Sequence, residues 1–277
     1  MSGATGKTLR LGRLLGVPRR PAVCLALDHA MMLGPIAGLE DPRTTLAAAI
    51  AAGIDAVILT PGLLVRHADL LAGPGKPVVI LRLDQTTMWR RGGRFGYDEG
   101  HTRLVTSVEE AVQLGADAVI TYLFTCHRSP ELETRSIEIA AAAARDARRF
   151  GLVWIAEPMA ARGGMIEDVA DPEVVAMNNR IAMELGADVL KTDWTGDART
   201  FADVVATAGA PVLVAGGARA GGDEAVIEMV EQIAASGAAG ILFGRNIIQS
   251  PDPGRLVREL RNAFDRRHGA RGRTGTS

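Results

Sequence analysis

Several residue types that commit a chain to a particular kind of protein are scarce in these 277 residues. Only two cysteines occur, Cys24 and Cys126, and they form neither a disulfide framework nor the ligand spacing of a metal site. No apolar run approaches the roughly 18 residues of a membrane span. The opening residues lack the apolar segment of a signal peptide. We therefore expect a cytoplasmic protein with reduced thiols and no membrane partner.

An excess of charge of one sign is also missing. The chain has 31 basic and 32 acidic residues and a net charge of −1, and its arginines do not gather in one tract. This distribution does not indicate a nucleic-acid partner. Apolar residues make up 47% of the chain and charged residues 23%, which is the balance of a globular protein with a sizeable core.

Lysine is rare, because only Lys7, Lys76 and Lys191 stand among the 31 basic residues. Lys191 ends an apolar segment that begins at Ala187. Arginine stays protonated in proteins, whereas a desolvated lysine can lose its proton and attack a carbonyl carbon. A lysine kept in an apolar segment is therefore a candidate nucleophile. The alternative is a lysine that reaches solvent from the end of a strand or pairs with Asp193.

Short apolar runs recur along the chain, and most are followed by a helical pattern. There are eight of them, at residues 22–27, 55–60, 77–83, 117–124, 151–157, 187–191, 210–215 and 240–243. Apolar runs without alternation are typical of parallel strands covered on both faces, and eight such units in about 250 residues predict a (β/α)8 TIM barrel. A doubly wound open sheet is the alternative, but no Gly-x-Gly-x-x-Gly follows the first run. We expect a single α/β domain over residues 1–277, with the barrel core at about 20–268.

Two segments fall outside this repeat. Residues 7–15 predict a short amphipathic helix before the first strand. The connection after the third strand, residues 84–106, is too long and too polar for an ordinary loop. Such a loop commonly covers an active site or is disordered. Because it contains Trp89 and several arginines, we expect an active-site lid or a subunit contact.

Residues with acid–base or nucleophilic chemistry stand just after the predicted strands, and in a barrel these positions converge on one mouth. They are Asp28, His29, Tyr122, His127, Glu157 and Lys191. The set suggests that Lys191 forms an iminium with a carbonyl substrate while a carboxylate or a phenol carries protons. His29 could also carry protons or make a structural hydrogen bond. The histidines are scattered, so we expect neither a metal nor a cofactor.

Glycine-rich turns follow the seventh and eighth strands. They contain Gly216 and Gly217 in the first turn, and Gly244 and Arg245 in the second. Backbone N–H groups in such turns can surround a phosphate, and Arg245 would add positive charge. The alternative is that Gly216 and Gly217 form only a tight turn. Since barrels place phosphate sites at these two turns, we predict a phosphorylated carbonyl compound as the substrate.

Several stretches also resemble a known enzyme group. Residues 27–29, 184–197 and 244–247 are similar to the class I aldolases typified by archaeal fructose-bisphosphate aldolase, in the DeoC/LacD-like superfamily. The first and last stretches are equally similar to the autoinducer-2 phosphate thiolase of the same group. The resemblance covers nearly the whole chain. It implies a (β/α)8 barrel, an iminium at Lys191, no metal, Asp28 near the scissile carbons, and homo-oligomers.

The chain departs from that group at two strand ends. Phe124 stands where the archaeal aldolase has its catalytic tyrosine, with Tyr122 two residues earlier. After the fifth strand, Glu157 and Pro158 replace a tyrosine-proline segment. This glutamate is similar to the one in class I aldolases of the tagatose-bisphosphate type. We therefore expect Glu157 to be the acid/base, with Tyr122 and His127 as alternatives.

These observations predict a class I aldolase that makes or breaks a carbon–carbon bond next to a phosphorylated ketone, with dihydroxyacetone phosphate as the expected donor. One alternative is a thiolase-like acyl transferase acting on a phosphorylated diketone. A second is a barrel that binds sugar phosphates without catalysis. The acceptor aldehyde and the direction of the reaction stay open at this stage.

Overall fold

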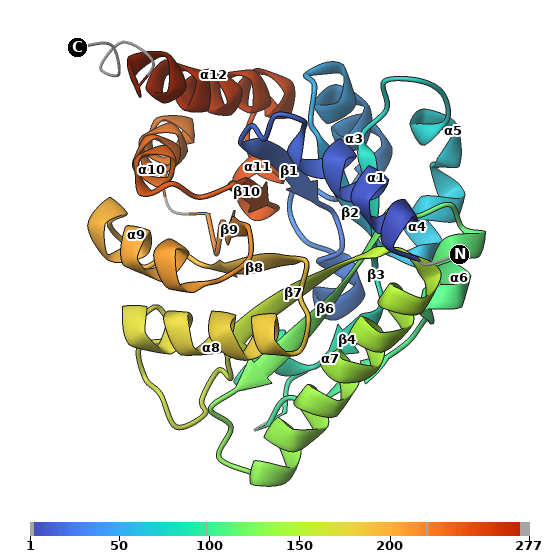
Figure 1. Ribbon diagram of the computed structural model, residues 1–277, viewed down its shortest axis with the longest axis vertical. Coiled ribbons are helices and arrows are strands. Elements are labelled where there is room, and N and C mark those ends of the chain that lie inside the picture. The colour runs from blue at the N-terminus through green and yellow to red at the C-terminus, as the bar shows by residue number, and fades with distance from the viewer. Residues whose placement is uncertain (1–2, 98, 220, 272–277) are drawn as a thin grey trace.

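The computed structural model describes residues 3–97, 99–219 and 221–271, and its parallel strands close into a barrel (Figure 1). Around the barrel the strand order is β1-β10-β9-β8-β7-β6-β3-β2. The predicted (β/α)8 barrel is confirmed. The predicted domain span of 1–277 includes a few residues outside the described part of the chain. The strands are β1 Ala22–Ala26, β2 Ala56–Leu59, β3 Val78–Arg82, β6 Ala118–Thr125, β7 Val153–Ala160, β8 Val189–Asp193, β9 Val212–Ala215 and β10 Gly240–Phe243.

Helices surround the barrel and connect successive strands (Figure 1). Asp41, Ser129 and Asp171 each cap a helix whose first residue is proline, the residue best suited to that position. Within the described residues, no helix is long and apolar enough to cross a membrane. The helices are α1 Ala4–Leu15, α2 Ala30–Leu33, α3 Pro42–Ala51, α4 Pro61–Arg66, α5 Ala68–Leu71, η1 Met88–Arg90, α6 Val108–Gln113, α7 Pro130–Phe150, α8 Pro172–Glu184, α9 Ala198–Thr207, α10 Asp223–Ser236, α11 Arg245–Ile248 and α12 Pro253–Arg271.

Alternation along each strand decides which side chains enter the barrel. On β8, Val189 packs in the inner cluster and Leu190 packs outward against the helices. Since side chains alternate with a period of two, Lys191 and Asp193 continue the inner row. The same parity places Glu157 inside the barrel on β7. The inward-facing side chains at the start of both strands are apolar, and those further along include Glu157 on β7 and Lys191 and Asp193 on β8, so functional side chains gather at one mouth.

The opposite end of the barrel is closed by α1. Leu14 and Leu15 pack into the inner cluster. Lys7 lies 2.8 Å from the carboxylate of Asp188 (Nζ to Oδ2), which also accepts a hydrogen bond from the backbone N–H of Trp154. Two of the three lysines therefore have ordinary structural positions, because Lys7 anchors this helix through its ion pair and Lys76 is exposed on the surface.

The long connection after β3 contains more regular structure than its polar composition indicates. Its ends form an antiparallel pair, β4 Asp84–Thr86 and β5 Thr102–Leu104, and the helix η1 lies between them. The sequence did not predict these short strands, because they form a separate two-stranded sheet and lack the apolar runs of the barrel strands. Trp89 in η1 reaches the mouth of the barrel.

Candidate active site

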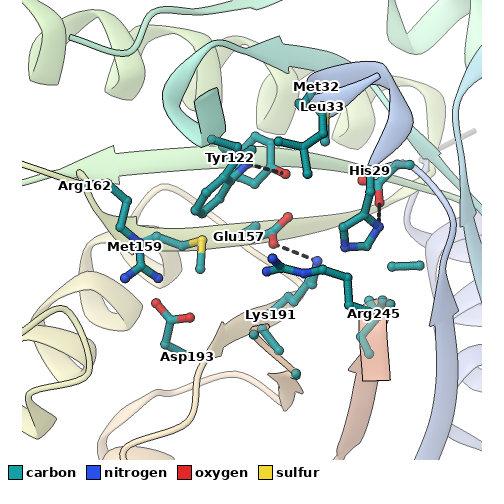
Figure 2. A pocket seen from close by; sticks show the side chains of 18 residues that line it. His29, Met32, Leu33, Tyr122, Glu157, Met159, Arg162, Lys191, Asp193 and Arg245 are labelled. Atoms are coloured by element: carbon teal, nitrogen blue, oxygen red, sulfur yellow. Dashed lines mark hydrogen bonds and ion pairs between the residues drawn. The ribbon is translucent and has the colours of Figure 1, made fainter. Parts of the chain in front are cut away.

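A cavity of about 140 Å³ opens at the mouth formed by the C-terminal ends of the strands (Figure 2). Its walls contain nine of the residues singled out from the sequence, so the structure brings both the chemical and the glycine-rich groups together. His127 is the exception, since it lines a separate hollow together with Arg128 and Gly163. The nine residues are Asp28, His29, Tyr122, Glu157, Lys191, Gly216, Gly217, Gly244 and Arg245.

Lys191 projects from β8 into this cavity and is only 6% exposed. Its Nζ lies 2.6 Å from Oε1 of Glu157 on the neighbouring strand (Figure 2). The pairing with Asp193 that we considered from the sequence does not occur. A buried amine beside a carboxylate has a partner that can accept its proton, which is what a nucleophilic lysine requires.

Arg82 organises the carboxylates around the lysine, and the sequence analysis missed it. Its side chain is fully buried at the end of β3. It donates to Oε2 of Glu157 at 2.5 Å and to Oδ2 of Asp28 at 2.7 Å. It also donates to Oδ1 of Asp84 at 3.2 Å. One guanidinium therefore holds three buried carboxylates, which satisfies charges that would otherwise be costly to bury.

The two aspartates bound by Arg82 have opposite pKa shifts. Burial on its own would raise the pKa of Asp28, but the positive charges of Arg82, of Lys191 and of His29, which is protonated at the low pH where Asp28 titrates, outweigh it and lower the pKa to about 2. Asp28 is therefore ionised at neutral pH. Asp84 is fully buried outside the cavity wall and accepts a hydrogen bond from the backbone N–H of Tyr122. Burial dominates there and raises its pKa to about 7.

Tyr122 lies between the long connection and the cavity. Its hydroxyl accepts a hydrogen bond from Nε1 of Trp89 at 3.0 Å. Its ring stacks on Phe124, with 5.1 Å between centroids, and lies 4.0 Å from the guanidinium carbon of Arg82. Burial raises the pKa of Tyr122 well above its usual value. The phenol is therefore protonated at neutral pH and can donate a hydrogen bond. Tyr122 lines the cavity and the fully buried Phe124 does not.

His29 stands beside the ionised Asp28, with 3.7 Å between Nδ1 and Oδ1. Burial lowers the pKa of His29, and the charge of Asp28 only partly opposes this effect. The imidazole is therefore mainly neutral at neutral pH. Gly244 must be a glycine, because a Cβ atom there would collide with the His29 ring.

The two glycine-rich turns are joined to each other. Nδ2 of Asn246 donates to the carbonyl oxygen of Gly216 at 2.7 Å. A Cβ atom on Gly216 would lie 2.5 Å from this nitrogen, so only glycine permits the contact. Gly217 has a φ of +64°, a conformation that glycine adopts without strain. The turns after β9 and β10 therefore form one unit at the edge of the cavity.

Arg245 supplies positive charge at that edge. Its side chain is half-buried, and its Nε is enclosed without a hydrogen-bond partner among the described residues. Burial and the nearby positive charge of Arg162 both lower the pKa of Arg245. An anion held at this point would offset both effects.

Other residues of the cavity wall were not predicted as site residues. They include Met159 and Arg162 near the end of β7, and Asp193 on β8, which the sequence suggested only as an ion-pair partner of Lys191. Burial raises the pKa of Asp193 to about 6, although Arg162 opposes the shift. Among the described residues, no group of three or more His, Cys, Asp or Glu is placed to hold a metal ion.

Comparison with known proteins finds aldolases by family, by sequence and by structure. Residues 22–250 match the DeoC/LacD family aldolase. The class 1 fructose-bisphosphate aldolase of Thermoproteus tenax is 35% identical over 94% of each chain. The 2-amino-4,5-dihydroxy-6-oxo-7-(phosphonooxy)heptanoate synthase of Streptomyces griseus is 31% identical, over 92% of this chain and 88% of that one. An archaeal fructose-1,6-bisphosphate aldolase, solved with its catalytic lysine covalently bound to the carbinolamine intermediate, has a TM-score of 0.80 and 32% identity, over 93% of this chain and 99% of that one.

Proposed function

The chain belongs to the DeoC/LacD aldolase family and is a carbon–carbon lyase that acts through a lysine Schiff base, and we propose that Lys191 forms this bond. The observation that carries the proposal is the 2.6 Å contact between Nζ of Lys191 and Glu157 inside the cavity. Among the residues that line the cavity, Lys191 is the only lysine. Lys7 is engaged at the other end of the barrel.

The proposed donor substrate is dihydroxyacetone phosphate. Its phosphate would lie against the turns at Gly216, Gly217, Gly244 and Arg245. An anion is favoured there because Nε of Arg245 has no hydrogen-bond partner among the described residues and because the positive charges of Arg245 and Arg162 lie near each other. The ketone carbon would then face Lys191. Names of two relatives, an aldolase of a bisphosphate and a synthase of a phosphonooxy compound, also support a phosphorylated substrate.

In the proposed reaction, neutral Lys191 attacks the ketone carbon and forms a carbinolamine, which loses water to give an iminium. Removal of a proton from the adjacent hydroxymethyl carbon gives an enamine. The enamine carbon attacks the aldehyde carbon of the acceptor, whose oxygen gains a proton. Hydrolysis of the product iminium releases the new ketone and regenerates Lys191. The same steps in reverse cleave the bond.

We assign the proton transfers near the amine to Glu157. It can accept the lysine proton, donate a proton to the departing carbinolamine hydroxyl, and remove the carbon-bound proton, because it stays within reach of Nζ. Asp28 is ionised, and its negative charge would stabilise the cationic iminium. Tyr122 as a protonated phenol and His29 as a neutral imidazole would donate hydrogen bonds to substrate oxygens.

Borohydride trapping tests this proposal. Reduction of the protein in the presence of dihydroxyacetone phosphate should add one reduced ligand per chain, and peptide mapping should locate it on Lys191. Lys191→Met should abolish labelling and turnover. Lys76→Met, which changes an exposed lysine, should leave both unchanged. Labelling of Lys7 or Lys76 in place of Lys191 would refute the assignment. Transfer of an acyl group to coenzyme A would support the thiolase-like alternative.

We also propose that the chain forms homo-oligomers and works in the cytoplasm. Large apolar side chains remain exposed in the connections after β3 and β7, with Phe95 72%, Tyr97 61% and Met165 64% exposed, and a subunit contact over these connections would remove them from water. Both cysteines are free and buried, which suits a reducing compartment. Analytical ultracentrifugation and cell fractionation would test these two points.

A further inference from the structure

Asp193 is a carboxylate in the cavity to which the mechanism above gives no task. It follows Lys191 by two residues on β8, so both side chains share the inward face of the strand. It lines the same cavity as Lys191 and Glu157. Among the described residues, no hydrogen bond or ion pair joins Asp193 to another side chain.

The position of Asp193 around the barrel separates it from the phosphate-binding turns. Around the barrel, β8 lies between β9 on one side and β7 on the other. The turns at Gly216 and Gly244 follow β9 and β10, whereas Arg162 follows β7. Figure 2 shows the carboxylate of Asp193 pointing toward the guanidinium of Arg162. With the donor phosphate on the β9–β10 side, the space near Asp193 and Arg162 is left for the acceptor.

Glu157 and Asp193, two of the three carboxylates that line the cavity, have different surroundings. Glu157 is held by two cations, because one oxygen contacts Lys191 and the other accepts from Arg82. Asp193 has no such partner. The charged groups around it are Arg162, from the segment after β7, Glu157 on β7 and Lys191 on β8. Burial is the main influence on its pKa, which is raised to about 6. Carboxylates in contrasting environments commonly divide acid and base tasks between them.

We propose that Asp193 is a second proton carrier, and that it serves the oxygen of the acceptor while Glu157 serves the amine. This assignment rests on the proposed function of the site. During bond formation, the enamine carbon attacks the aldehyde carbon, the C=O π electrons move to oxygen, and protonated Asp193 gives its proton to that oxygen. During cleavage, the Asp193 carboxylate takes the hydroxyl proton, the electrons of that O–H bond form the C=O π bond of the aldehyde, and the electrons of the breaking C–C bond move to the iminium and give the enamine.

Arg162 supports this division of tasks in two ways. Its positive charge opposes the rise in the Asp193 pKa, which keeps the group able to ionise near neutral pH. Its guanidinium also faces the same space and lies 5.8 Å from the Trp89 ring (carbon to centroid). An acceptor aldehyde would therefore be bounded by Arg162 and Trp89, with its carbonyl oxygen toward Asp193.

Separate measurement of the two half-reactions tests the proposal. Exchange of the carbon-bound hydrogen of dihydroxyacetone phosphate with deuterium oxide requires the Schiff base but no acceptor. Removal of dihydroxyacetone phosphate from the two compounds named for the relatives leaves glyceraldehyde 3-phosphate and aspartate semialdehyde as aldehydes. Condensation is measured with whichever of these two and glyceraldehyde the wild-type protein uses fastest. Asp193→Asn should slow condensation by about 100-fold or more, while exchange stays within about twofold of wild type. Glu157→Gln should slow both.

Further variants distinguish a proton carrier from a structural role. Asp193→Glu, which keeps the carboxyl group, should recover part of the condensation rate lost in Asp193→Asn. Asp203→Asn, on the exposed face of α9, should alter neither half-reaction. If Asp193→Asn condenses as fast as wild type, or slows exchange and condensation equally, Asp193 is not this proton carrier. If wild-type protein neither exchanges hydrogen nor forms a borohydride adduct at Lys191, the proposed function itself fails.

Discussion

Glu157 and Lys191 face each other from neighbouring strands, and Oε1 of the glutamate lies 2.6 Å from Nζ of the lysine. The second oxygen of Glu157 is held at 2.5 Å by Arg82. The carboxylate is thereby fixed in orientation, with one oxygen directed at the amine. A general acid/base has to lie within about 2.6–3.2 Å of the atom that it serves, and Glu157 meets that condition before any substrate enters.

Replacement of Glu157 by glutamine keeps the shape of the side chain and removes its titrating group. We expect turnover to fall by at least about 100-fold, the typical contribution of a general acid/base. Tyr122→Phe should cost much less, because Tyr122 provides only a hydrogen bond from a protonated phenol. Steady-state kinetics on both variants would check this order. A larger loss at Tyr122 would transfer the acid/base assignment to the phenol.

Arg245→Ala should weaken the binding of phosphorylated ketones selectively. Loss of a charge-assisted contact costs about 2 kcal/mol, roughly 30-fold in affinity. The concentration dependence of borohydride trapping, compared between dihydroxyacetone phosphate and dihydroxyacetone, measures this effect. The exposed Arg258 provides a matched control, Arg258→Ala, which should leave both affinities unchanged. Equal losses for the two ketones would show that Arg245 supports the fold and does not bind phosphate.

Much of the fold and most of the site follow from the sequence because barrel geometry is regular. Each apolar run forms a strand of the barrel, because a parallel strand that is buried on both faces consists mainly of apolar residues. The side chains after those runs then share one mouth. This reasoning predicts that Glu157 and Lys191 lie at that mouth, and both line the cavity there. Which carboxylate contacts the lysine depends on the stagger between β7 and β8, and the sequence does not contain that information in readable form.

Two further features were overlooked for identifiable reasons. Arg82 stands inside the apolar run of β3, where it was read only as part of a strand, although a charge in a buried strand requires buried partners. The apolar run that carries Glu157 predicts a strand over residues 151–157. In the structure β7 continues to Ala160. Its pairing with β8 ends at Ala156, so no backbone N–H is needed at Pro158 for a hydrogen bond to β8.

The pKa of Asp84 predicts a pH dependence of stability. The pKa is raised from 3.8 to about 7 by burial, so the folded protein binds more protons than the unfolded chain between these values. The contribution of Asp84 to stability is therefore fully present below about pH 4 and is lost as the pH rises through 7. Relative to Asp84→Asn, the free energy of unfolding of the wild type should fall by up to about 1.4 kcal/mol per pH unit in this window. Urea denaturation of both proteins at several pH values measures the difference. Parallel curves would contradict the raised pKa.

Arg82→Met should be the most damaging of these changes to the stability of the protein. The substitution keeps an unbranched side chain of similar length but leaves Asp28, Asp84 and Glu157 without the cation that they share. Removal of one partner from a buried ion pair typically costs about 3–5 kcal/mol, because the remaining charge stays buried and unpaired. We expect a loss of that size in the free energy of unfolding, measured by urea denaturation at pH 7.

Two further variants show whether the loss comes from charge or from packing. Arg66→Met removes an exposed arginine and should change stability by less than about 0.5 kcal/mol. Arg82→Lys keeps one positive charge but cannot direct donors at three carboxylates from a planar fork, so its stability should lie between those of wild type and Arg82→Met. If Arg82→Lys is as unstable as Arg82→Met, the geometry of the guanidinium matters more than its charge. If Arg82→Met is as stable as wild type, the three carboxylates find other partners and Arg82 does not organise the site.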